Sequence, residues 1–321
     1  MSFLWHLRRF TRRQGLAALL AATVLANTRV DAQQPAGKPA AEPQNVELRT
    51  KDEVVLQATF YPGSNGKETI PIIMLHEHKG NRRDFDGLAR LFQGEYFGAS
   101  VLVPDLRGHG ESTVVAGSNR PLSADKLNAK QFQAMVAFDM EACKKFLMER
   151  HHKGELNIEQ LTLVGAEMGA SVAMLYARTD WSWPTLSTGK QGQDVRAVAM
   201  ISPQTVFKGL RIADALAEPD NFGFRTNVQF FLAVGAEDNK ALKDVERLDK
   251  QLRRFRPNEE GKRPEELSIV LSRFPTKLQG TDILEERTFG LDTQLAQFVD
   301  FRVKQRAADV PWKERKSPLG N

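Results

Sequence analysis

Short apolar segments and segments of helical periodicity alternate along most of this sequence. The apolar segments are residues 70–75, 100–104, 161–164, 195–201, 228–234 and 267–271, and the helical segments are 84–93, 130–150, 168–178, 241–255 and 293–305. Strands separated by helices favour a mostly parallel sheet, because a parallel pairing needs a crossover connection. We therefore predict an α/β fold with helices on both faces of the sheet. The domain should begin with a hairpin of residues 45–50 and 53–61.

Residues 1–32 have the pattern of an export signal. The basic segment RRFTRR, residues 8–13, precedes the apolar run 15–26. Val30-Asp31-Ala32 resembles a cleavage site. Residues 11–16, TRRQGL, also resemble a twin-arginine signal. The alternative is an uncleaved anchor, although twelve apolar residues fall short of the roughly 20 that span a membrane. We predict a periplasmic or secreted protein that meets the membrane only if the signal stays uncleaved.

The rest of the chain divides into a linker, one domain and a tail. Residues 33–44 are rich in Pro and Ala and predict a linker, and residues 45–307 form the α/β domain. Residues 308–321 form a polar tail, of which we expect residues 312–321 to be frayed. The formal charge of +5 comes mostly from residues 1–32, which hold five arginines and one aspartate. The remainder has 40 basic and 39 acidic residues, which gives no reason to expect a nucleic-acid partner.

The segment LTLVGAEMGAS, residues 161–171, predicts a buried strand, a tight turn and the start of a helix. This is the setting of the nucleophile elbow, where hydrolases place a serine in the pattern G-x-S-x-G. Here the central residue of the pattern is Glu167. Glu167 therefore either takes over the chemistry of the serine or abolishes it.

Three other motifs follow predicted strands of the sheet. Residues 75–81, LHEHKGN, follow the third strand, residues 105–112 read DLRGHGES after the next strand, and residues 235–238 read GAED after a late strand. Together with residues 165–169 they resemble the α/β-hydrolase superfamily, in its esterase- and lipase-like form, from about residue 45 to 307. The resemblance implies a serine, an acid and a histidine that act in that order along the chain.

The sequence departs from this pattern at two of the three catalytic positions. Glu167 stands at the serine position and Asp238 fits the acid position, whereas Gln279 stands where relatives of this shape carry a histidine. The chain has six histidines, and none of them follows residue 152. The base that would activate a nucleophile is therefore missing from the loop after the last strand.

The predicted oxyanion loop, His76-Glu77-His78, is also altered, because Glu77 stands where a glycine usually follows the histidine. A carboxylate there places negative charge beside donors that would serve a developing oxyanion. Glu77, Glu167 and Asp238 are expected near one cleft, where at least one should have a raised pKa unless a cation is present. The candidate cations are Lys79, Arg107, His78 and His109.

Three readings of this cleft remain open. The first is a network of hydrogen bonds and ion pairs in a pocket that has lost its function. The second is a site for a small molecule or a protein partner. The third is a metal held by Glu167, Asp238 and His78, although their spacing matches no recognised motif.

Our leading prediction is an exported pseudo-hydrolase that binds a ligand or partner through the old cleft, with no cofactor and no metal. The alternative is an active esterase or hydrolase with a non-standard carboxylate site. It resembles the haloalkane dehalogenases and epoxide hydrolases, which use an aspartate at the elbow. A glutamate is one methylene longer, and a near-attack geometry tolerates little displacement.

Overall fold

The computed structural model describes residues 41–94, 96–187, 189–217, 222–259, 261–263 and 266–315. The predicted export signal and residues 33–40 of the predicted linker lie outside these residues. Within the described part of the chain, no helix has both the length and the apolar character that crossing a membrane requires.

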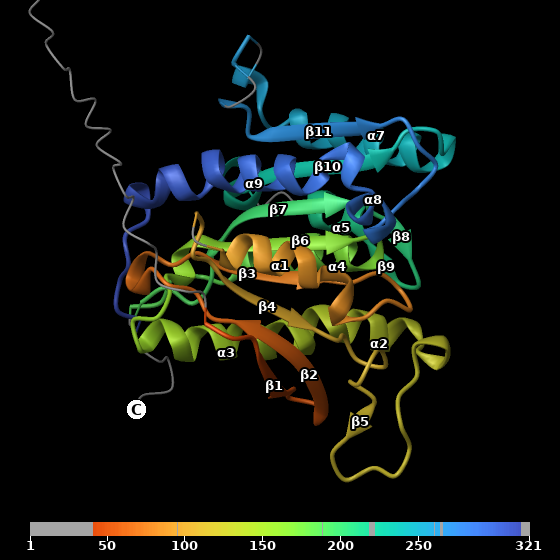
Figure 1. Cartoon of the computed structure of the whole chain (residues 1–321), viewed down its shortest axis with the longest axis vertical. Helices are drawn as coiled ribbons and strands as arrows, with labels where there is room; N and C mark the ends of the chain where they lie inside the picture. The colour runs from red at the N-terminus through yellow and green to blue at the C-terminus, as the bar shows by residue number, and fades with distance from the viewer. Residues whose placement is uncertain are drawn as a thin grey trace, which may run out of the picture. The chain divides into compact units, whose positions relative to one another are not determined.

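A mixed sheet forms the centre of the domain (Figure 1). Its strands are β1 (Gln44–Arg49), β2 (Val54–Tyr61), β4 (Ser100–Pro104), β3 (Pro71–Leu75), β6 (Leu161–Ala166), β7 (Val195–Ile201), β10 (Gln229–Gly235) and β11 (Ile269–Phe274), in that spatial order. The pairings from β4 through β11 are parallel, whereas β2 is antiparallel to β1, to β4 and to the short β5 (Val114–Val115). The mostly parallel sheet is therefore confirmed.

Helices cover both faces of this sheet (Figure 1). They are α1 (Asp86–Gln93), α2 (Ala129–Ala134), α3 (Met140–His152), α4 (Met168–Ser182), α5 (Ile212–Ala217), α6 (Phe222–Asn227), α7 (Asn239–Arg253), α8 (Thr281–Glu285) and α9 (Leu291–Arg302). Successive residues of a strand point to opposite faces. Ile73 therefore packs in the core with α3, α4 and α7, and Ile72 packs in the core with α1 and α9.

Two predicted elements differ from the observed ones. The helix predicted over 130–150 contains a π-helical segment, Met135–Asp139, between α2 and α3. Asp139 in this segment is buried and accepts hydrogen bonds from Arg107. The strand predicted at 267–271 begins instead at Ile269, because the backbone N–H of Ser268 binds the Glu259 carboxylate rather than the sheet.

The expectation of a frayed tail is wrong for residues 312–315. The ring of Trp312 lies 4.9 Å from that of His151, and the Nζ of Lys67 lies 3.9 Å from the Trp312 ring. Arg315 is 7% exposed and forms an ion pair of 2.8 Å with Asp194. The sequence could not predict this order, because the aromatic and basic side chains of the segment bind residues that are distant along the chain.

Candidate functional site

Glu167 occupies the sharp turn that joins β6 to α4, with φ 45° and ψ −106°. A non-glycine residue with positive φ is strained, and such strain is typical of functional positions. The flanking glycines are required sterically. A Cβ at Gly165 would lie 2.5 Å from the backbone of Gly169, and a Cβ at Gly169 would overlap the carbonyl oxygen of Leu75. The chain thus retains the geometry of a nucleophile elbow with a carboxylate in the central position.

The carboxylate of Glu167 is half-buried and lies among other acids. Its Oε2 accepts a hydrogen bond of 2.8 Å from Nε2 of Gln204. Burial raises the pKa of Glu167 to about 7, and the negative charges of Glu77 and Asp282 contribute to the same shift. Near neutral pH this side chain is therefore divided between its neutral and charged forms.

Glu77 lies beside Glu167 at the loop that leads into α8. Its Oε2 accepts a hydrogen bond of 3.0 Å from the backbone N–H of Thr281. Gly280 (φ 58°) separates the two glutamates: a Cβ there would overlap the Glu77 carboxylate and lie 3.3 Å from Cγ of Glu167. Burial raises the pKa of Glu77, and the charges of Asp282 and Asp84 add to that effect. The structure thus brings Glu77 and Glu167 together.

Asp238 has a structural role at the start of α7. Its side chain accepts hydrogen bonds from the backbone N–H groups of Lys240 (2.9 Å) and Ala241 (3.0 Å), which makes it the N-cap of this helix. The third carboxylate that acts on Glu167 is therefore Asp282 rather than Asp238. The expectation that Asp238 would complete the acidic group is corrected accordingly.

Gln279, in the loop after β11, binds the end of β10. Its Nε2 donates to the carbonyl oxygen of Gly235 (2.9 Å), and the N–H of Gly235 lies 3.4 Å from its Oε1. An amide has no lone pair that accepts a proton near neutral pH. The position where relatives carry a histidine therefore connects two loops and offers no general base.

Burial lowers the pKa of all three histidines near the site. Nδ1 of His76 lies 2.7 Å from the carbonyl oxygen of Glu77, so it donates, and its Nε2 accepts from the N–H of Leu106. Burial lowers the pKa of His76 to about 4. His109 Nδ1 likewise donates to the carbonyl oxygen of Arg107.

His78 continues this chain of hydrogen bonds. Because Nδ1 of His109 donates, its Nε2 accepts from Nδ1 of His78 (3.2 Å). The Nε2 of His78 then accepts from Nζ of Lys208 (3.3 Å). Burial, followed by the charge of Lys208, lowers the pKa of His78 to about 4. Neither His78 nor His109 therefore supplies the positive charge that the sequence suggested.

The other cations expected to neutralise the glutamates bind different acids. Lys79 pairs with Asp125 at 2.9 Å, and Arg107 pairs with Asp52 and Asp139. In the described ranges, no ion pair joins Glu77 or Glu167 to a cation. No group of three metal-binding side chains occurs there either, so the described residues do not form the metal site considered for Glu167, Asp238 and His78.

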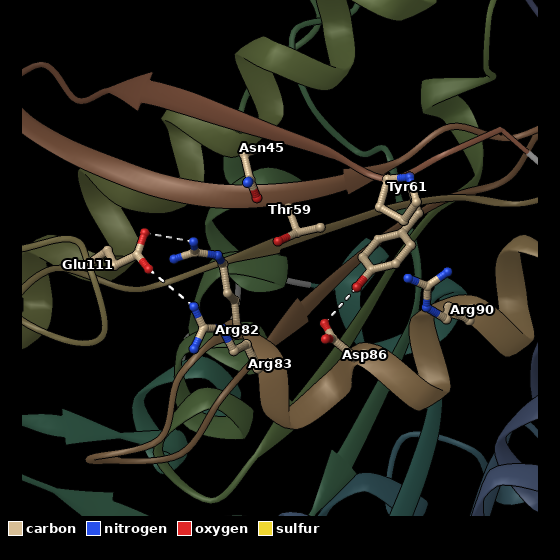
Figure 2. Close-up of a pocket in the computed structure, with 9 residues that line it drawn as sticks. Asn45, Thr59, Tyr61, Arg82, Arg83, Asp86, Arg90 and Glu111 are labelled. Atoms are coloured by element: carbon tan, nitrogen blue, oxygen red, sulfur yellow. Dashed lines mark hydrogen bonds and ion pairs between the residues drawn. The ribbon is translucent and has the colours of Figure 1, made fainter.

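The D-x-R-G loop after β4 is fixed by its own ion pairs. The backbone N–H and the guanidinium of Arg82 bind Asp105, and the same guanidinium reaches Glu111 at 2.8 Å. Figure 2 shows Arg82 and Arg83 directed toward Glu111 at a hollow of about 280 Å³. Because these arginines bind acids of the same loop, we interpret this motif as structural.

Sequence reasoning missed three residues that surround the glutamates. Asp282 lies in the loop searched for a histidine, so its proximity could have been inferred. Gln204 and Ser202 follow β7 and carry no motif. Ser202 has φ 49°, and its Oγ accepts from the N–H of Gly280 (3.0 Å), which fixes the loop between the two glutamates.

Comparison with known proteins places this architecture in one structural class, the α/β-hydrolase fold. No family model matches the sequence. No curated protein matches it either. Among solved structures, an esterase from Pyrococcus furiosus is 17% identical, with TM-score 0.51, over 82% of this chain and 93% of that one.

Two further solved structures show the same likeness. A dienelactone hydrolase from Anabaena variabilis is 16% identical, with TM-score 0.53, over 82% of this chain and 100% of that one. The thermostable carboxylesterase EstE1, from a metagenomic library, is 13% identical, with TM-score 0.53, over 83% of this chain and 90% of that one. At these identities the likeness establishes the fold alone.

Proposed function

We propose that this protein is an exported pseudo-hydrolase that binds a ligand or a protein partner through the cleft at Glu167. One observation carries the proposal: the elbow keeps its strained backbone and its two required glycines, while the position of the nucleophile holds Glu167. Gln279, at the position of the base, binds Gly235. An elbow preserved without a nucleophile–base pair suits recognition better than acyl transfer.

The altered oxyanion loop supports the same proposal. Acyl transfer requires hydrogen-bond donors aimed at the oxygen that becomes negative in the transition state. The loop expected to supply these donors instead carries the carboxylate of Glu77, which accepts from the N–H of Thr281 beside Glu167. Negative charge at this place would oppose an oxyanion, and it favours a ligand that brings positive charge or hydrogen-bond donors.

The export part of the proposal rests on the basic, apolar and small-residue pattern of residues 1–32. Fractionation of cells that express the full chain, followed by N-terminal sequencing, tests it. We expect a mature protein that begins near residue 33 in the periplasm or the medium. An intact N-terminus in the cytoplasm would contradict export.

The experiment that tests the pseudo-hydrolase proposal restores the missing groups. Wild type, Gln279→His alone, and the triple variant Glu167→Ser/Gln279→His/Glu77→Gly are incubated with a fluorophosphonate probe. We expect labelling of the triple variant at position 167 and none of the other two proteins. Labelling of the wild type would contradict lost chemistry, and a folded triple variant that stays unlabelled would contradict a preserved cleft.

A second candidate function is a working hydrolase in which Glu167 transfers protons or attacks the substrate. The observation in its favour is the Glu167 pKa of about 7, which suits general acid–base catalysis. Turnover of p-nitrophenyl acetate by wild type, with loss in Glu167→Ala, would support it. Turnover that survives both Glu167→Ala and Asp238→Ala would exclude that assignment.

A further inference from the structure

The hollow of about 280 Å³ in Figure 2 lies between the antiparallel strands β1 and β2 and the helix α1. The register pairs Asn45 with Thr59, and Tyr61 follows two residues later, so these three side chains share one face of the strands. The other lining residues are Pro43, Arg82, Arg83, Asp86, Arg90 and Glu111. Glu77 and Glu167 are not among them, so the hollow is a different site from the cleft at the elbow.

The floor of the hollow is fixed by bonds within the protein. The Arg82 side chain is 7% exposed and binds Asp105 and, at 2.8 Å, Glu111. Tyr61 is 1% exposed, and its hydroxyl donates a hydrogen bond of 2.6 Å to Asp86. Because these buried polar groups already have partners, they keep their positions, and the walls are preorganised for a ligand.

Four side chains around this floor retain hydrogen-bonding capacity. Arg83 is 73% exposed and makes a single contact, of 3.4 Å, with Glu111. Within the described residues, the side chains of Asn45, Thr59 and Arg90 form no hydrogen bond or ion pair, and Arg90 only lies 5.9 Å from an aromatic ring. The guanidinium groups donate, whereas the amide and the hydroxyl both donate and accept. A ligand in the hollow therefore meets donors and acceptors side by side.

The charges around the hollow balance. Three arginines and two acids line it, and Asp105 binds one of these arginines from outside the hollow. The two signs also lie close together, because Arg83 contacts Glu111 and the other pair, Asp86 and Arg90, is one helical turn apart. A carboxylate bound to either arginine would therefore approach an acid, and an ammonium bound to either acid would approach an arginine. A hydroxyl group binds both a carboxylate and a guanidinium and carries no charge, so it fits these walls best.

We propose that this hollow binds a neutral sugar of one ring. Its hydroxyl groups bridge Arg83 and Glu111 at one end and reach Arg90 at the other. Between these ends they bond to Asn45 and Thr59 of the two strands. The volume, at the lower limit of small-molecule sites, restricts the ligand to about this size. The site is independent of the function proposed for the cleft at the elbow.

The probes that test this site are D-glucose, D-galactose and D-mannose, each titrated into the ¹⁵N-labelled full chain at pH 7. We expect the backbone amide signals of residues 44–45, 59–61 and 82–90 to shift and saturate with at least one sugar, with Kd below about 10 mM. The uronate and the 2-amino derivative of that sugar carry a charge, and each should bind at least about fivefold more weakly. Absence of saturation with all three sugars overturns the proposal, as does tighter binding of either charged derivative.

Three variants complete the test, and the amide spectrum shows whether each is folded. Asn45→Ala/Thr59→Val removes the groups on the strands and should weaken binding at least about tenfold. Gln57→Ala, on the same strand but outside the hollow, should leave Kd unchanged. Arg90→Gln lowers the charge of the hollow by one, so the affinity for the amino sugar should rise relative to that for the uronate. Unchanged binding in the double variant overturns the proposal, and so does an unchanged ratio in Arg90→Gln, which decides the outcome alone if the double variant does not fold.

Discussion

Buried carboxylates occur at both ends of the sheet, but their partners differ. At the amino end, Asp180 and Asp194 are fully buried and pair with Lys144, and Asp194 also pairs with Lys190 and Arg315. Burial alone would raise the pKa of Asp194, yet these three cations hold it well below its usual range. At the carboxyl end, burial raises the pKa values of Glu77 and Glu167.

The difference distinguishes a stabilising network from a candidate functional site. Asp194 is held in its charged form and pairs with Arg315 of the C-terminal segment, so its removal should destabilise the fold. At the carboxyl end, burial disfavours the charged forms of Glu77 and Glu167, and perturbed pKa values of this kind are more frequent at functional sites. The following predictions test this contrast, from the largest expected effect to the smallest.

Asp194→Asn should give the largest loss of stability. It leaves Lys144 buried without one of its two acids, and breaking a buried ion pair costs about 3–5 kcal/mol. Because the folded-state pKa of Asp194 lies below the ordinary value of 3.8, its contribution is present above that pH and is lost on acidification. Urea unfolding at pH 7 and pH 3 should therefore show a smaller difference between variant and wild type at pH 3. Equal effects at both pH values would contradict the ionised network.

Arg315→Met should destabilise the domain by about 1–3 kcal/mol, because Lys144 and Lys190 continue to neutralise Asp194. Urea denaturation measures the loss. The exposed Arg211→Met, which removes a 3.7 Å surface pair, is the control and should cost under about 1 kcal/mol. Limited proteolysis should also cleave Arg315→Met faster near residue 312. Equal rates in variant and wild type would contradict the docking of this segment.

Glu167→Gln should stabilise the protein at pH 8. The folded-state pKa of about 7 lies above the ordinary glutamate value of 4.5, so wild-type stability falls as pH rises through this range. The full shift would correspond to about 3 kcal/mol, which solvent screening at this half-buried site reduces to about 1–2 kcal/mol. Melting curves from pH 4 to 8 should show a shallower slope in Glu167→Gln than in wild type and in the exposed control Glu149→Gln. A slope unchanged in Glu167→Gln would contradict the account.

Gln279→Ala should have the smallest effect. It removes the hydrogen bond to the carbonyl oxygen of Gly235, worth about 1 kcal/mol. Gln57→Ala, which removes an exposed bond to Glu47, provides the comparison and should cost less. A loss above about 3 kcal/mol for Gln279→Ala would indicate that the amide supports more than the contact of two loops.

The sequence allowed the sheet and the elbow to be predicted, because both depend on local patterns. Apolar runs between helical segments specify buried parallel strands, and Gly165 and Gly169 mark a turn that only glycines permit. The partners of Glu167 could not be predicted in the same way. Gln204 reaches it from beyond β7 with no signature in sequence, whereas Asp282 lies in the loop searched for a histidine but matches no motif. Similarly, Asp238 fits both a catalytic acid and a helix N-cap, and only the fold distinguishes these roles.

Our central proposal is that Glu167 occupies the position of a nucleophile but does not attack a substrate. The most direct measurement is the initial rate of p-nitrophenyl acetate hydrolysis by the wild-type chain and by Glu167→Gln, which keeps the size of the side chain. We predict that both rates equal the rate with an inert protein at the same concentration. A wild-type rate above this background that disappears in Glu167→Gln would contradict the claim and show that the glutamate reacts.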